Sequence, residues 1–265
     1  MILNIKFDNI DMDFFKFGIG KNIMILIPGV SIKSVMESEK IIKDAYSIFK
    51  DDFTVYVFDR NKNMKKSYTI FDMANDMIKV IDRLELKDIY LAGASQGGMI
   101  SAIVSYKRPD LVKKLSINSI TAIVNDNYYL FFDEMIRLLN DNNLDLVVDM
   151  FMKKVYSKEL YESTKDSMAP FIASITDGDI STFIIECEAL KDFNILDNIK
   201  NIKCETLIIA GKLDLVFNYN DSKNISKLIK NSKLYIYDNY GHALYDEAPD
   251  FKERVYDFFL SKEDL

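Results

Sequence analysis

The sequence is short of several residue types, and each shortage excludes a class of protein. It contains two cysteines and a single histidine. Cys187 and Cys204 lie far apart in the chain, so we expect two reduced thiols instead of a disulfide framework or a zinc site. One histidine does not supply a histidine-based metal site, and no glycine-rich phosphate loop or cofactor lysine motif is present. We therefore expect neither a metal nor a cofactor.

A surplus of basic residues and a long apolar run are also missing. The net charge is −7, whereas nucleic-acid binding needs a basic surface. The apolar run at 23–27, IMILI, is far too short to cross a membrane. Charged residues interrupt the first 17 positions, which is not typical of a signal peptide. We expect a cytoplasmic protein, a monomer or homodimer, with no nucleic-acid or membrane partner.

What the sequence does contain is a recurring alternation of strand-like and helix-like segments. Hydrophobic residues make up 49% and charged residues 28%, as in soluble globular proteins. The predicted strands are 2–7, 12–18, 23–28, 53–59, 89–94, 114–119, 206–211 and 233–238. The first two are predicted to form a hairpin, and the later ones are nearly continuous in apolar residues, as in parallel sheets buried on both faces. The alternation predicts an α/β fold, a mostly parallel central sheet with helices on both faces.

Helical periodicity is clearest at 70–84, where Thr69 and Asp72 offer a capping box. Between 121 and 196 the alternation stops, and two segments, YYLFFDEMIRLLN and LDLVVDMFMKKVY, carry apolar residues at i, i+3, i+4 and i+7. This pattern predicts an insertion of about three or four helices between the sixth and seventh strands. The predicted division of the chain is core at 1–120, insertion at 121–196 and core at 197–265.

The segment GASQG, around Ser95, fits the pattern G-x-S-x-G with a predicted strand before it and a helical pattern after it. In that context the pattern predicts a nucleophile elbow, a strained strand-to-helix turn that exposes a serine hydroxyl at a helix N-terminus. Gly93 and Gly97 leave room for the turn, and Gly98 lets the helix pack close to the sheet. Alone, the pattern fits equally well an ordinary turn with a serine N-cap.

A serine hydroxyl is a weak nucleophile until a base accepts its proton. His242, the only histidine, follows the last predicted strand, where such a base is needed. A carboxylate must then orient the imidazole. Asp214 is the best candidate because it follows a buried strand directly. Asp238 and Asp59 also stand at strand ends, where aspartates usually form turns.

The order Ser95, Asp214, His242 is the one found in the α/β-hydrolase superfamily, and the chain resembles a capped member of it over essentially its whole length. GASQGG resembles the elbow, AGKLDLVF the acid loop, and GHALYDEAPDF the histidine loop with the last helix. The resemblance implies that the insertion at 121–196 is a helical cap over the active site.

The resemblance also implies an oxyanion hole made of backbone N–H groups. One donor would be Gln96, directly after the serine, and the other Val30, after the third strand. The family often has His-Gly before that second donor, whereas this chain has Pro28-Gly29.

The implied function is a serine hydrolase that cleaves a small carboxylic ester through an acyl-enzyme. Aromatic and aliphatic residues of the insertion favour an uncharged or apolar small-molecule substrate. Arg137, the only arginine there, could pair with a substrate carboxylate, although a solvent-facing position is favoured. The alternatives are a peptidase, thioesterase, acyltransferase or C–C bond hydrolase of the same family, and a non-catalytic ligand-binding protein on this fold.

Overall fold

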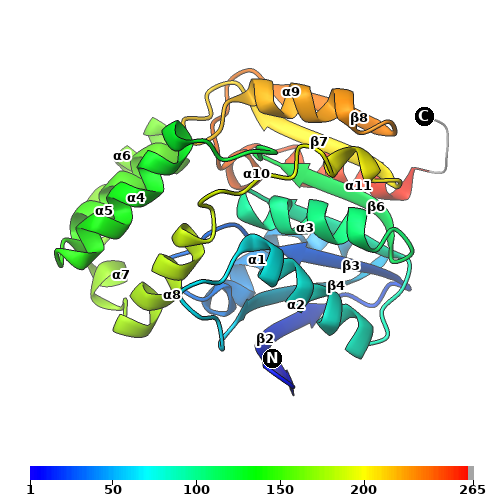
Figure 1. The fold of residues 1–265 in the computed structure, drawn as a ribbon, viewed down its shortest axis with the longest axis horizontal. Helices are drawn as coiled ribbons and strands as arrows, with labels where there is room; N and C mark the ends of the chain where they lie inside the picture. The colour runs from blue at the N-terminus through cyan, green and yellow to red at the C-terminus, as the bar shows by residue number, and fades with distance from the viewer. Residues whose placement is uncertain (262–265) are drawn as a thin grey trace.

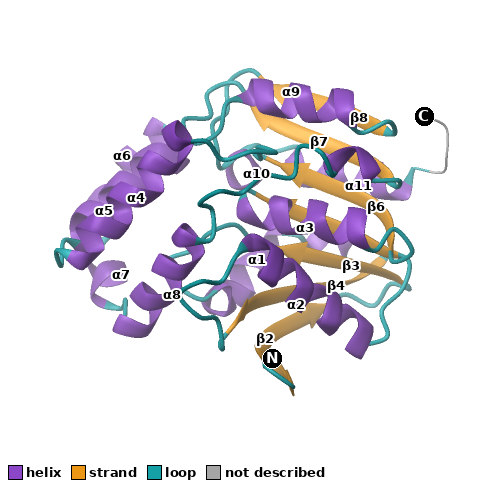
Figure 2. Ribbon diagram, in the orientation of Figure 1, coloured by secondary structure: helices purple, strands orange, loops and turns teal. Residues whose placement is uncertain are grey.

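The computed structural model describes residues 1–261, and its centre is one eight-stranded sheet (Figures 1 and 2). The strands are β1 Leu3–Phe7, β2 Ile10–Phe17, β3 Asn22–Ile27, β4 Phe53–Asn61, β5 Ile89–Ala94, β6 Val112–Asn118, β7 Glu205–Gly211 and β8 Ser232–Tyr237. Their order in the sheet is β1-β2-β4-β3-β5-β6-β7-β8. The pairings of β2 with β1 and β4 are antiparallel, and the others are parallel. The mostly parallel sheet confirms the predicted fold class.

Helices cover both faces of the sheet, so the central strands, such as β5, are buried on both sides. On one face lie α2 Ile70–Arg83, α3 Gln96–Lys107 and α9 Tyr219–Leu228, and on the other α1 Glu39–Ala45 and α11 Phe251–Leu260. The neighbours Met24 and Ile25 on β3 belong to the cores on opposite faces. This alternation explains why the parallel strands read as unbroken apolar runs.

Helix α2 begins where the sequence predicts. The Asp72 N–H donates to Thr69 Oγ1 at 3.2 Å, and the Thr69 N–H donates to the Asp72 carboxylate at 2.9 Å. This capping box satisfies two N–H groups that have no partner within the helix.

Five α-helices lie between β6 and β7, where the sequence predicts three or four. They are α4 Asp126–Asn140, α5 Leu144–Val155, α6 Lys158–Thr164, α7 Ala169–Ala173 and α8 Asp177–Glu188. Two of them, α6 and α7, have only seven and five residues, too few for periodicity to separate them from loops. In Figure 1 these helices stand together beside the sheet, in green to yellow-green.

The two chain segments that enter and leave this insertion run side by side. Ile123 and Asn194 form an antiparallel bridge, and the Val124 N–H donates to the Phe193 carbonyl at 2.9 Å. The first and last segments of the insertion therefore leave the core side by side, near the carboxyl end of β6.

The helices and the two cysteines bear on the expectations about membranes and disulfides. Among residues 1–261, no helix combines the length and the apolar character that a membrane span requires. Cys187 is buried and Cys204 half-buried, and both are free thiols.

Helix α3 approaches the end of β3 closely, and Gly97 makes that approach possible. A Cβ at Gly97 would lie 2.1 Å from the Ile27 carbonyl oxygen and 2.4 Å from that of Pro28. Both oxygens are backbone atoms, so neither can move aside without displacing the strand end.

We predict that Gly97→Ala lowers the free energy of unfolding by about 3 kcal/mol, because the added methyl overpacks a backbone contact. Gly178→Ala in α8 is the matched control, since its nearest neighbour would be Thr176 Oγ1 at 3.6 Å. That variant should gain up to about 1 kcal/mol from helix propensity. Urea denaturation measures both, and equal shifts in the two variants would contradict the prediction.

Candidate active site

Ser95 sits on a strained turn between β5 and α3. Its φ of 52° and ψ of −126° lie in a region that costs a non-glycine residue about 1–3 kcal/mol. Ser95 occupies the N-cap position of α3, but its side chain makes no capping hydrogen bond. A Cβ at Gly93 would lie 2.3 Å from the Gly97 carbonyl oxygen, and one at Gly98 would lie 2.5 Å from Ile120 Cγ2. The ordinary N-cap interpretation therefore does not describe this turn.

Asp214 and His242 form a buried hydrogen-bonded pair at the ends of the neighbouring strands β7 and β8. His242 Nδ1 lies 2.9 Å from Asp214 Oδ2, and the two side chains are 3% and 2% exposed. The other carboxylate oxygen, Oδ1, accepts the N–H groups of Val216 at 2.7 Å and Phe217 at 2.9 Å. An imidazole whose Nδ1 donates to a carboxylate presents the lone pair of Nε2 as an acceptor.

The rival carboxylates have other partners. Asp238 is exposed and forms an ion pair with Lys212 at 2.5 Å. Asp59 accepts a hydrogen bond from the Ser34 hydroxyl and one from the Arg60 N–H. Of the three aspartates considered, Asp214 is the one that the structure brings to His242.

The end of β6 holds both the serine turn and the histidine loop. The Ser95 N–H donates to the Asn118 carbonyl at 2.9 Å, and Ser119 Oγ donates to the His242 carbonyl at 2.8 Å. In the part of the chain that the structure describes, Ser95 Oγ itself makes no hydrogen bond. Catalytic hydrogen bonds are often long or misaligned until substrate binds. Ser119 was not singled out by the sequence, in which it is only a residue at a strand end.

The loop after β3 lies against the serine turn. A Cβ at Gly29 would come within 3.1 Å of Ser95 Cβ. The chain leaves β3 toward β4 on one side and later returns to β5 on the other, and such switch points are where α/β sheets bind ligands. The fold therefore brings the loop that carries Val30 beside Ser95 and Gln96.

Behind this loop lies a buried guanidinium that sequence reasoning missed. Arg60 Nη2 donates to the carbonyl oxygens of Pro28 at 2.8 Å and Gly29 at 3.0 Å, and to Gln96 Oε1 at 3.1 Å. Gln96 Nε2 in turn donates to the Glu186 carbonyl at 2.7 Å. One network thus joins β4, the loop after β3, the serine turn and helix α8.

Glu186 brings a carboxylate to the same network from the insertion. Its Oε1 lies 3.5 Å from Arg60 Nε, and its Oε2 accepts the Ser31 N–H at 3.2 Å. Burial raises the pKa of Glu186 to about 7, although the charge of Arg60 and the Ser31 N–H both oppose that rise. The sequence signal was present: Glu186 falls on the buried stripe of α8 that Phe183 and Cys187 define, where a carboxylate is unusual.

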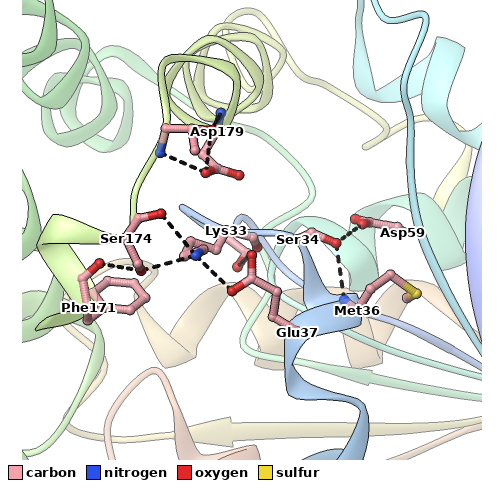
Figure 3. A network of polar contacts seen from close by, with 10 residues as sticks. Lys33, Ser34, Met36, Glu37, Asp59, Phe171, Ser174 and Asp179 are labelled. Atoms are coloured by element: carbon pink, nitrogen blue, oxygen red, sulfur yellow. Dashed lines mark hydrogen bonds and ion pairs between the residues drawn. The ribbon is translucent and has the colours of Figure 1, made fainter. Parts of the chain in front are cut away.

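A second contact joins the same loop to the insertion, as Figure 3 shows. Lys33 Nζ donates to the Ser174 carbonyl at 3.1 Å and to Ser174 Oγ at 3.0 Å. It also forms an ion pair with Glu37 at 2.7 Å. The insertion therefore contacts the loop after β3 twice, through Ser174 at the end of α7 and through Glu186 in α8.

A cleft of about 660 Å³ opens between α5 and α6 and the loops that carry Asp214 and His242. Pockets of 300–1,000 Å³ are typical for small molecules. Its lining includes Lys153, Lys154, Tyr156, Lys158, Lys212, Leu213, Leu215 and Gly241. Arg137 lies elsewhere: it is exposed and pairs with Glu134 and Asp141 on or beside its own helix.

Comparisons with known proteins agree on one fold family. The profile of the alpha/beta hydrolase fold matches residues 24–249. The Caulobacter sp. (strain K31) protein named "Putative carbamate hydrolase RutD" is 22% identical over 219 residues, covering 80% of this chain and 82% of that protein.

Two solved structures are similar in fold over nearly the whole chain. MGS-M2, an alpha/beta hydrolase enzyme from a Medee basin deep-sea metagenome library, has a TM-score of 0.88 at 18% identity, covering 99% of both chains. The enol-lactonase from Burkholderia xenovorans LB400 has a TM-score of 0.84 at 16% identity, covering 98% of this chain and 100% of that one. At these identities the similarity establishes the fold and nothing further.

The raised pKa of Glu186 predicts how stability depends on pH. The folded protein keeps this proton up to about pH 7, whereas an unfolded glutamate releases it near about pH 4.3. Between these values the unfolded chain binds fewer protons, so the free energy of unfolding falls as pH rises. Glu186→Gln removes this contribution, and its stability relative to wild type should rise by about 2 kcal/mol between pH 5 and pH 8.

Urea denaturation at the two pH values measures the difference. Glu188→Gln, which removes a carboxylate from the same helix, is the matched control and should follow the wild-type pH dependence. An unchanged pH dependence in Glu186→Gln would contradict the prediction.

Proposed function

This chain belongs to the alpha/beta hydrolase fold family, and from that premise we propose that it is a serine hydrolase that cleaves a small carboxylic ester. The observation that carries the proposal is the buried pair of His242 Nδ1 and Asp214 Oδ2 at 2.9 Å. Such a pair fixes the imidazole tautomer and stabilises the imidazolium that forms during catalysis. The strained Ser95 turn on the same edge of the sheet supplies the hydroxyl.

In the proposed mechanism, Ser95 Oγ attacks the ester carbonyl while His242 Nε2 accepts the hydroxyl proton. The tetrahedral intermediate collapses, the C–O bond to the alcohol breaks, and His242 returns the proton to the leaving oxygen. A water molecule then attacks the acyl-enzyme with His242 again as the base. This second step releases the carboxylic acid and restores the Ser95 hydroxyl.

We propose that the N–H groups of Val30 and Gln96 stabilise the negative oxygen of each tetrahedral intermediate. Two observations support this role: Gly29 contacts the Ser95 turn, and Gln96 directly follows the nucleophile. Each donor in such a site contributes about 3 kcal/mol to the transition state.

We propose that residues 121–196 act as a cap and that the substrate is uncharged or apolar. The cleft lies beside Asp214 and Gly241, and neither Ser95 nor His242 is among its lining residues. Three of the four lysines that line the cleft have partners of their own. Lys153 and Lys212 pair with Asp149 and Asp238, and Lys154 Nζ lies over the Phe131 ring. Leu213 and Leu215 add apolar side chains to the lining of the same cleft.

A carbamate is the second candidate substrate class, because the name of the Caulobacter relative gives carbamate hydrolysis as its activity. The same groups would act on it, with a carbamoyl-enzyme as the intermediate. The nitrogen lone pair makes that carbonyl less electrophilic than an ester carbonyl. Turnover of an ester and of a carbamate that share one leaving group decides between the two classes.

The first test is labelling with a fluorophosphonate probe, followed by mass spectrometry of the peptides. Wild type should carry one adduct, on Ser95, and Ser95→Ala should carry none. Ser105→Ala, which removes a buried hydroxyl from the same helix, should be labelled like wild type. If folded wild type stays unlabelled, the non-catalytic ligand-binding alternative replaces this proposal.

Asp214→Asn tests the orienting carboxylate. The amide Oδ1 can still accept the two loop N–H groups, but its NH2 faces His242 Nδ1 and favours the tautomer whose Nε2 carries the proton. We predict a loss of about 10⁴-fold in kcat, as for the equivalent change in other serine hydrolases, measured with p-nitrophenyl acetate. Asp238→Asn is the control and should keep full activity; a similar kcat in both variants would remove Asp214 from the mechanism.

A further inference from the structure

Arg60 is a buried guanidinium that contacts both segments of the proposed oxyanion hole. It is 8% exposed, and its Nη2 reaches the carbonyls of Pro28 and Gly29 and the side chain of Gln96. The proposed mechanism gives Arg60 no chemical step, since it binds backbone and amide oxygens behind the loop.

The contact with Gly29 determines the direction of the Val30 N–H. The Gly29 carbonyl and the Val30 amide belong to one peptide unit, and in a trans peptide the C=O and N–H point in opposite directions. Because Arg60 holds the carbonyl at 3.0 Å, the N–H must point away from Arg60. Glycine permits rotations of the backbone that other residues resist, so a Pro-Gly loop needs an external group to hold this peptide in one orientation.

The contact with Gln96 holds the second donor. The side-chain amide of Gln96 accepts from Arg60 at one end and donates to the Glu186 carbonyl at the other. Its backbone N–H is the one that follows the Ser95 turn. A single guanidinium therefore hydrogen-bonds to the peptide of one proposed donor and to the side chain of the other.

Above its pKa of about 7, Glu186 is ionised and supplies the charge that a buried guanidinium needs. Its carboxylate lies 3.5 Å from Arg60 Nε, an atom that has no hydrogen-bond partner within residues 1–261. The same carboxylate accepts the N–H of Ser31, the residue after Val30. Because Glu186 comes from α8, this arrangement is complete only when the insertion is docked on the core.

We infer that Arg60 is the positioning residue of the oxyanion hole and that Glu186 makes its position depend on the docked insertion. The inference rests on the proposed serine-hydrolase function and deepens it. A merely structural role would change the stability of the protein and leave the reactivity of the folded enzyme as it is.

The test compares wild type, Arg60→Met and Arg60→Lys as full-length proteins. The second-order rate of Ser95 phosphonylation by a fluorophosphonate is measured together with the thermal unfolding temperature. Arg60→Met should react about 100-fold more slowly, the loss typical of one oxyanion donor. Arg60→Lys should recover part of the rate, because an ammonium can donate to the same carbonyls. Arg83→Met, which removes an exposed arginine that lies over the Phe7 ring, is the control and should react like wild type.

A variant that keeps the core neutral guards against misfolding. Removal of Arg60 alone leaves Glu186 buried without its partner, whereas the double variant Arg60→Met, Glu186→Met replaces the pair with apolar side chains, a change that proteins often tolerate. It should react as slowly as Arg60→Met while unfolding near the wild-type temperature. For the insertion's part, Glu186→Gln should react more slowly than wild type at pH 8, and Glu188→Gln should not.

A second measurement reports on the oxyanion hole directly. The ratio of kcat/KM for phenyl acetate to that for its thionoester measures how much the hole favours oxygen over sulfur. This ratio should fall in Arg60→Met, because the donors no longer discriminate.

The outcomes separate the two proposals. A folded wild type that is not labelled at Ser95 would refute the serine-hydrolase function and this inference with it. Labelled wild type with an equal rate and an equal ratio in Arg60→Met would overturn the role of Arg60 alone. A slower rate in Arg60→Met with an unchanged ester-to-thionoester ratio would show a structural role and would also overturn the inference.

Discussion

The hydrogen bond between Asp214 and His242 is the interaction on which the candidate site depends. A carboxylate buried this deeply is tolerated only when its oxygens are satisfied, and the loop after β7 provides two N–H groups for that purpose. The histidine loop is fastened from two sides: Ser119 holds the His242 carbonyl, and the Ala243 N–H donates to the Val155 carbonyl of α5 at 2.9 Å. The pair is therefore shielded from water by the insertion as well as by the core.

The insertion contacts both halves of the site by separate routes. Near the histidine loop, the Ser157 N–H donates to Glu247 Oε1 at 3.0 Å. Near the loop after β3, Glu186 of α8 accepts the Ser31 N–H, and Lys33 donates to the carbonyl of Ser174 at the end of α7. Helix α5 thus both lines the cleft and contacts the loop of the proposed base. If the proposed function holds, we expect changes in the insertion to affect turnover as well as substrate choice.

Much of this architecture could be predicted from local sequence patterns. Apolar runs marked all eight strands, and the capping box located the start of α2 at Ile70. The helices α6 and α7 could not be predicted, because one or two turns carry too little periodicity. Among the site residues, Ser95 was recognisable from its glycines and His242 from being the only histidine. Arg60 was not, because an arginine near the end of a strand resembles a surface residue until its surroundings are known.

The sequence by itself determined the order of the strands along the chain, the place of the strained serine turn and the identity of the proposed base. These features depend on residues close together in the chain or on a residue type that occurs once. Only the tertiary structure decided which aspartate meets the imidazole, since that hydrogen bond joins residues 28 positions apart. It also decided what holds the peptide between Gly29 and Val30. The Gly29 carbonyl meets Arg60, 31 residues away, and the Ser31 N–H meets Glu186, 155 residues away. Contacts of this range are set by how the sheet and helices pack, and no local pattern records them.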